Sequence, residues 1–138
     1  ESGLLEMPLK LTLKPNEKVL IGTAVITNAG QKAEITIQNT VPVLREKDII
    51  TEENADTHAK KIYHVILNMY IDPANEQKYH KIYFKLVKEL FNAVPNDGFI
   101  GLVAEISQKI LEGNHYRALK ICKKLLTFEA ELMANVTG

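Results

Sequence analysis

Hydrophobic and polar residues alternate with a period of two over the first third of the chain, which is typical of strands with one exposed face. Segment 9–14 shows the pattern most clearly, because leucine alternates there with lysine or threonine. Further short segments with strand character cover residues 18–21, 24–27, 33–37 and 41–44. Their close spacing predicts five short strands that form an antiparallel meander.

Turn-forming residues separate the predicted strands. Pro15-Asn16 predicts a turn, because proline fixes φ and asparagine tolerates a left-handed backbone. Asn28-Ala29-Gly30 predicts a hairpin turn between the third and fourth strands. Pro42 has no N–H to donate, so we expect the fifth strand to lie at a sheet edge or to begin at this proline.

After residue 50 the hydrophobic spacing lengthens to about 3.6 residues, which predicts amphipathic helices. Thr51, Asn54 or Asp56 is expected to cap the first helix. The predicted boundaries that follow are Asp72-Pro73 after the first helix, 76–94 for the second, and breaks at 95–98 and at Gly113-Asn114. The short connections imply antiparallel neighbours in a helical bundle.

The inward-facing positions of these four predicted helices follow the helical period. They are Ile62, Val65, Ile66, Met69 and Tyr70, then Tyr79, Ile82, Tyr83, Leu86, Leu90 and Phe91, then Ile100, Val103, Ile106, Ile110 and Leu111, and finally Tyr116, Leu119, Cys122, Leu125, Leu126 and Leu132. Strands followed by helices predict an α+β protein with a β module at 7–50 and a helical module at 51–138.

Length and composition fit this organisation. With 138 residues, 46% of them hydrophobic, the chain suits one compact domain or two small modules. No apolar run approaches the roughly 18 residues that a membrane helix needs. Residues 1–6 precede Met7 and resemble a leader or cloning remnant, so we exclude them from the predicted fold. The single cysteine, Cys122, is expected to be buried and unreactive.

Few residues suggest catalysis. The four histidines, at 58, 64, 80 and 115, show no pair at i,i+4 and no fixed carboxylate partner, so we expect surface or core roles. The sequence has no glycine-rich phosphate loop, no Cys-x-x-Cys and no Gly-x-Ser-x-Gly. We therefore predict a protein that is not an enzyme and has no metal or cofactor.

Basic residues recur at helical spacing on two of the predicted helices, although 17 basic and 17 acidic residues cancel overall. The two stripes are Lys78, Lys81, Lys85 and Lys88, and Arg117, Lys120, Lys123 and Lys124. Cations so placed suit auxiliary contacts to phosphates. The alternative is an ordinary solvated helix face.

The strand region resembles the carbon storage regulators, a family of small bacterial RNA-binding proteins. The matching residues are Leu11, Thr12, Glu17, Ile21-Gly22, Val43 and Arg45. Two positions depart from that family: Leu13 replaces an arginine that contacts RNA, and Asn16 replaces a glycine of the turn. The missing guanidinium puts the base specificity of that family in doubt here.

The whole chain from Met7 onward resembles the FlbT family, the flagellum biosynthesis repressors of alphaproteobacteria. Segments 7–30, 43–63 and 68–73 carry this resemblance. It implies a cytoplasmic regulator that binds the 5′ untranslated region of flagellin mRNA and lowers its translation and stability, without binding DNA or membrane. It also implies a FlaF-type regulator as counterpart and leaves open whether the effect on flagellin is negative or positive.

In the carbon storage regulators, two chains exchange strands, so the first strand of one lies beside the last strand of the other. The resemblance therefore implies an RNA site made of Lys10, Leu11, Thr12 and Lys14 with Val43, Leu44 and Arg45 from a second copy. Arg45 is the leading candidate, because a core-facing position at a strand end lets its guanidinium reach past the sheet rim. The alternative is a local ion pair with Glu46 or Asp48.

A meander of about forty residues buries little apolar surface, and its edges invite pairing. We therefore expect a symmetric homodimer. A second hypothesis is a protein-interaction adaptor whose helical module docks FlaF, flagellin or an assembly factor. The zero net charge and the absence of an arginine at position 13 favour that alternative.

Overall fold

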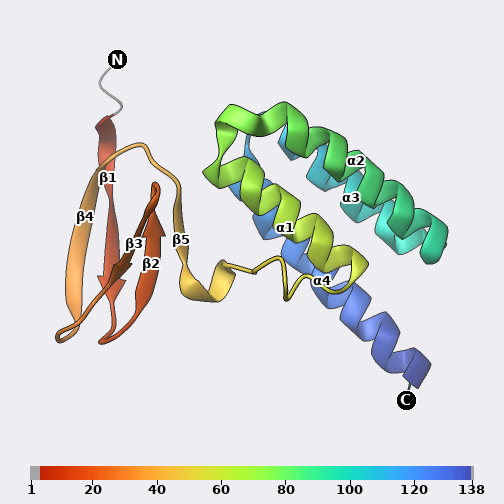
Figure 1. Cartoon of the computed structure of the whole chain (residues 1–138), viewed down its shortest axis with the longest axis horizontal. Helices are drawn as coiled ribbons and strands as arrows, with labels where there is room; N and C mark the ends of the chain where they lie inside the picture. The colour runs from red at the N-terminus through yellow and green to blue at the C-terminus, as the bar shows by residue number, and fades with distance from the viewer. Residues whose placement is uncertain (1–3, 138) are drawn as a thin grey trace. The chain divides into compact units, whose positions relative to one another are not determined.

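The computed structural model describes residues 4–137, with side chains over 8–135. The chain divides into two compact units, residues 1–49 and residues 50–138. The first unit contains the strands and the second the α-helices (Figure 1). The α+β class is thereby confirmed. No helix of the described residues is long and apolar enough to cross a membrane.

The β unit contains five strands within the described residues, and they form two sheets. Their bounds are β1 Leu4–Leu13, β2 Lys18–Ile21, β3 Ala24–Thr27, β4 Ala33–Asn39 and β5 Val43–Arg45. β1 pairs with β4, whereas β2 lies between β3 and β5, and every pairing is antiparallel. The five antiparallel strands are confirmed, but the predicted meander is wrong, because β1 pairs with β4 rather than with β2.

The two sheets share one small hydrophobic core. Its buried residues are Leu11, Leu13, Val19 and Ile37, with Ile21, Ile35, Val41 and Val43 packed around them. The alternating pattern correctly identified these inward faces, since neighbouring positions of a strand point to opposite sides. The alternating pattern carries no information on which strands pair. Two facing sheets cover apolar surfaces that a single meander would leave exposed.

Asn28 explains why β3 and β4 do not form the predicted hairpin. Its side-chain Nδ2 donates to the carbonyls of Leu13 at 3.1 Å, Lys14 at 3.1 Å and Gln31 at 2.9 Å. The residue therefore ties the end of β3 to the end of β1 and leads the chain into the other sheet. The turn at Asn16 is confirmed, with a left-handed φ of 67°.

The start of β1 differs from the prediction. The strand begins at Leu4, which pairs with Asn39 of β4, so residues 4–6 belong to the fold instead of lying outside it. The register shifts between Leu4 and Leu9. At the other end of the unit, β5 begins directly after Pro42 and lies at a sheet edge, as the proline predicts. The short 3-10 helix η1, Glu46–Asp48, follows it.

The helical unit has four α-helices within the described residues: α1 His58–Ile71, α2 Glu76–Ala93, α3 Asp97–Leu111 and α4 His115–Thr137. The 3-10 helix η2, Pro73–Asn75, joins α1 to α2. α1 packs against α2 and α4, and α3 packs against α4 (Figure 1). The cap of α1 is Thr57, whose hydroxyl accepts the Lys60 N–H, so none of the three predicted caps is correct. Gly113 ends α3 with a φ of 79°.

The core of the helical unit confirms most of the predicted inward positions on α1 and α4. Four predicted core residues on α2, α3 and α4 are instead exposed: Ile82, Ile100, Leu111 and Tyr116. Phe99, which was not predicted, is completely buried. For the three residues on α2 and α3, the difference arises because α2 packs mainly on α1 and α3 mainly on α4, so each of these helices buries a narrower stripe. Cys122 is buried as predicted, and burial raises the pKa of its thiol.

We predict opposite effects of alanine at two glycines of α3. A Cβ at Gly98 would overlap the Phe128 ring, which packs on Phe99 with ring centroids 5.0 Å apart. Gly98→Ala should lower the free energy of unfolding by about 1–2 kcal/mol, because the ring must move. Gly101 has nothing within 4 Å of such a Cβ, and Gly101→Ala should raise the free energy by about 0.5–1 kcal/mol. Urea unfolding followed by circular dichroism measures both, and equal effects would contradict the predicted packing.

Candidate functional site

Arg45 ends β5 and faces the core side of its sheet. It lies opposite Val19 in the β2–β5 register, two positions after Val43, which lies opposite Ile21. Because Val19 belongs to the core, the Arg45 side chain leaves the sheet on the core face. This is the orientation that the parity of positions 43 and 45 predicts, at the end of the strand where a long side chain can reach outward.

The guanidinium of Arg45 joins the two sheets at that end. Its Nη1 lies 2.8 Å from Glu17 Oε2 and donates to the Thr12 carbonyl oxygen at 3.2 Å. An ion pair of Arg45 is what the alternative interpretation expected, although it named Glu46 or Asp48 and not Glu17 as the carboxylate. Arg45 and the first strand meet within one chain, and strand exchange is not required to bring them together.

Glu17 holds this arrangement from the β1–β2 turn. Its second oxygen, Oε1, accepts the backbone N–H of Lys14 at 2.9 Å. That backbone N–H and then the Arg45 guanidinium hold the pKa of Glu17 below its usual value of 4.5. The carboxylate is therefore ionised at neutral pH and partly neutralises Arg45, whose side chain is still 30% exposed.

The other predicted RNA-binding residues divide into exposed and buried positions. Lys10, Thr12 and Lys14 are exposed on β1 and just after it. Leu11 and Leu44 are buried, so their side chains are covered within this chain, and their role in RNA binding stays a prediction. Val43 is half-buried against the core of the β unit.

The two basic stripes are exposed on the helical unit, Lys78, Lys81, Lys85 and Lys88 on α2 and Arg117, Lys120, Lys123 and Lys124 on α4. Two of these lysines lie over aromatic rings. Lys78 Nζ is 5.6 Å from the Tyr79 ring centroid, and Lys120 Nζ is 5.3 Å from that of Tyr116. Their exposure is compatible with phosphate contacts and equally with a solvated face, so the phosphate role stays a prediction.

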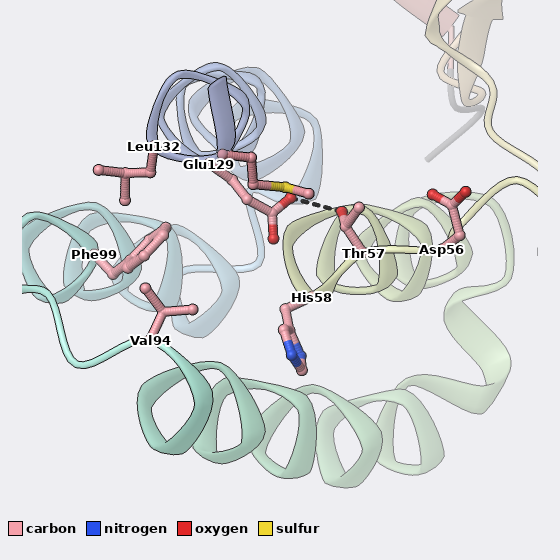
Figure 2. Close-up of a pocket in the computed structure, with 8 residues that line it drawn as sticks. Asp56, Thr57, His58, Val94, Phe99, Glu129 and Leu132 are labelled. Atoms are coloured by element: carbon pink, nitrogen blue, oxygen red, sulfur yellow. Dashed lines mark hydrogen bonds between the residues drawn. The ribbon is translucent and has the colours of Figure 1, made fainter. Parts of the chain in front are cut away.

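The helical unit also contains an apolar groove of about 420 Å³. Val94, Phe99, Leu132 and Met133 form its apolar walls, and Thr57, His58 and Glu129 lie at its polar end (Figure 2). Within the described residues the Nδ1 of His58 is buried without a hydrogen-bond partner. This groove was not predicted from the sequence.

Glu129 closes the polar end of the groove and caps α1 from α4. Its Oε1 accepts the Thr57 hydroxyl at 2.6 Å (Figure 2). Its Oε2 accepts the Ala59 N–H at 3.1 Å. Only 7% of this residue is exposed. An anion is favourable there, because the N-terminus of a helix carries partial positive charge. The signal in the sequence was a carboxylate at helical spacing from Leu125, on the apolar face of α4.

Two histidines have the fixed carboxylate partner that the sequence did not suggest. His80 Nε2 lies 3.1 Å from Glu76 Oε2, at i,i+4 on α2, and His115 Nε2 lies 3.3 Å from the same oxygen. The expectation that the histidines lack such a partner is therefore wrong. Among the described residues, this is the group whose side chains are suited to hold a metal ion.

Comparisons with known proteins identify relatives over nearly the whole chain. The family described as Flagellar protein FlbT matches residues 9–133. A Bradyrhizobium diazoefficiens protein named as a probable flagellum biosynthesis repressor is 44% identical over 127 residues, 91% of this chain and 85% of that protein. A protein of the same name from Rhodopseudomonas palustris is 40% identical over 132 residues, 94% of this chain and 100% of its own length. The flagellum biosynthesis repressor FlbT of Caulobacter vibrioides is 33% identical over 132 residues, 96% of this chain and 94% of that protein. No solved structure matches this chain.

We predict that the buried carboxylate of Glu129 stabilises the helical unit. Glu129→Gln removes the charge at the α1 N-terminus and places an amide nitrogen against donor groups, so it should lower the free energy of unfolding by about 1–3 kcal/mol. Glu131→Gln is the matched control, because Glu131 is exposed on the same helix, and it should change this free energy by less than about 0.5 kcal/mol. Urea unfolding gives both values, and equal effects would contradict the capping role.

The lowered pKa of Glu17 gives a pH-dependent contribution to stability. Because the folded state binds this proton less well than the unfolded state, the contribution is complete above the usual pKa of 4.5 and is lost as pH falls through the lower folded value. Glu17→Gln should therefore destabilise the protein at neutral pH, and the difference from wild type should vanish in acid. Unfolding free energies at several pH values measure it. A difference that is constant with pH would contradict the ionised pair.

Proposed function

The chain belongs to the FlbT family of flagellar proteins, and on that premise we propose that it represses flagellum biosynthesis after transcription. It would do so by binding the 5′ untranslated region of flagellin mRNA and lowering the translation and stability of that message. Occupying a leader requires no chemistry from the protein, because a bound protein excludes the ribosome or exposes the message to a nuclease. The account therefore depends on a surface that binds unpaired RNA.

The position of the Arg45 guanidinium is the observation that carries this proposal. Its hydrogen bonds to the Thr12 carbonyl and to Glu17 both use Nη1. A guanidinium has five N–H donors in a fixed fork, and these two bonds use none of the donors on Nε and Nη2, which would serve a ligand in this proposal. Such a fork matches phosphate oxygens or the acceptor edge of guanine.

Glu17 favours recognition of a base over general attraction to phosphate. A phosphate that approaches Arg45 must compete with a carboxylate 2.8 Å away, so binding to any polyanion is weakened. A base edge that accepts from Nε and Nη2 leaves the Arg45–Glu17 pair intact. Unpaired loop bases, whose edges are free, are the ligand that fits this geometry.

Exposed lysines add a contribution that does not depend on sequence. Lys10 and Lys14 are exposed on the β unit, beside Thr12 in the chain. Contacts from these lysines and from the two basic stripes would raise affinity and make it fall with salt, without selecting a base.

The proposal includes a symmetric homodimer. The β unit has a small core. Within the described chain β3 pairs with β2 alone, and all of its residues are exposed. Such an edge is a template for a second copy. A twofold dimer would carry two copies of the Arg45 site.

The apolar groove of the helical unit favours a second candidate function, which is the docking of a flagellar protein. An exposed Met133 at its wall suits contact with an apolar side chain of FlaF, flagellin or an assembly factor. In that case the β unit would serve as a dimerisation platform and would not read RNA.

Gel shifts with a flagellin leader and an unrelated RNA of equal length test the proposal. Arg45→Ala should weaken binding to the leader by about 10-fold or more and remove the preference for it. Arg117→Ala is the matched control, because position 117 holds the other arginine of the chain and is exposed on α4. It should weaken binding to both RNAs by a similar, smaller factor.

Two outcomes would overturn the RNA proposal. One is an absence of preference for the leader in the wild-type protein, and the other is an Arg45→Ala variant that keeps the preference. The adaptor function replaces the RNA-binding function if two results are found together. The wild-type protein ignores RNA but binds FlaF or flagellin, and a charge placed in the groove by Leu132→Asp abolishes that binding. Light scattering that gives the mass of one chain at micromolar concentration would contradict the homodimer.

A further inference from the structure

Three side chains from two helices converge at one point of the helical unit. Glu76 and His80 lie on the first two turns of α2, and His115 is the first residue of α4. One ligand atom of each lies within 4.8 Å of those of the other two. We propose that these residues bind a divalent transition-metal ion of the zinc class, an activity independent of the RNA function proposed above.

Two of the three distances between ligand atoms fit a tetrahedral ion, and the third is within 4.8 Å. Both imidazole Nε2 atoms approach the same carboxylate oxygen, at 3.1 Å for His80 and 3.3 Å for His115. In a tetrahedral zinc site with bonds of about 2.0–2.1 Å, neighbouring ligand atoms are about 3.3 Å apart. An ion therefore fits between these atoms with small side-chain movements, and a water molecule would complete the coordination.

The two nitrogens are also left without another partner. Both Nε2 atoms are buried, and among the described residues neither makes a hydrogen bond of acceptable geometry, despite their short distances to the carboxylate. Leaving two such atoms unpaired in the folded state is costly. A bound cation would use both lone pairs at once, whereas one carboxylate oxygen is shared poorly between two imidazole N–H groups.

The ligand types select the class of metal. Two imidazoles and one carboxylate suit zinc and its neighbours in the first transition row, whereas magnesium and calcium prefer sites made entirely of oxygen. The side chain of Glu76 is 36% exposed and that of His115 is 11% exposed, so an ion can enter from the carboxylate side. The i,i+4 spacing places Glu76 and His80 on one face of α2.

The bound ion would join the starts of α2 and α4. The backbone at the start of α4 is already fixed, because the Asn114 side chain accepts the Arg117 N–H at 3.2 Å. An ion that binds the folded state alone stabilises it by linkage. We therefore expect a structural site whose occupancy raises the stability of the helical unit.

Metal titration of the protein without a polyhistidine tag tests the site. Isothermal titration with Zn²⁺ should give one ion per chain, and Co²⁺ should give the intense visible absorption of tetrahedral coordination. Zn²⁺ should raise the midpoint of thermal unfolding, and EDTA should return it to the starting value. The proposal would be overturned if the protein at micromolar concentration gave no heat of Zn²⁺ binding and no visible absorption band with Co²⁺.

Variants locate the site. His80→Gln and His115→Gln should each weaken zinc binding by about 100-fold or more, and Glu76→Gln by at least about 10-fold. His64→Gln removes an imidazole from α1 outside the cluster, so its affinity should stay within about twofold of wild type. Tight binding that survives the loss of both cluster histidines would overturn the assignment.

A measurement on the wild-type protein tests the site even if the variants fail to fold. X-ray absorption of its zinc complex should show two imidazole ligands with oxygen ligands, and any other histidine count would contradict the site. The RNA gel shift is a separate readout, because none of the three ligands belongs to the Arg45 site. Loss of one activity without the other therefore distinguishes the two proposals.

Discussion

The link from Arg45 to Glu17 and Thr12 is the interaction on which the proposed function of the β unit depends. It connects β5 of one sheet with β1 of the other at the edge of a small shared core. Both side chains are partly exposed, so as an isolated ion pair it would contribute little to stability. In the proposed function the importance of this link is geometric. It holds the Arg45 cation beside β1 and would limit the attraction of that cation for unselected phosphates.

The sequence predicted the faces of the strands but not their partners. Alternation identified Leu11, Leu13 and Val43 as inward, since a period of two determines the side of a sheet. The pairing of β1 with β4 depends on non-local contacts, among them the three hydrogen bonds of Asn28. Glu17 was missed as the partner of Arg45 for the same reason, because the two residues are distant in the sequence whereas Glu46 and Asp48 are adjacent.

The helical unit shows the same division between local and non-local information. The helices and their breaks follow from periodicity, proline and glycine, but α2 and α3 bury less than their apolar residues suggest. The contacts that hold the helix ends lie between helices: Glu129 of α4 caps α1, and His115 of α4 lies next to Glu76 of α2. The spacing of Glu76 and His80 was visible in the sequence, whereas the approach of His115 required the fold.

The central claim is that Arg45 contacts unpaired flagellin leader RNA, and side-chain NMR tests it most directly. The chain has arginines at positions 45 and 117 alone, so two Nε–H signals are expected, and Arg117 serves as an internal reference. On addition of a flagellin leader, the account predicts a saturable shift of the Arg45 signal together with the amides of Thr12 and Lys14. Equal shifts of both arginines, or an unchanged Arg45 signal with RNA bound, would contradict it.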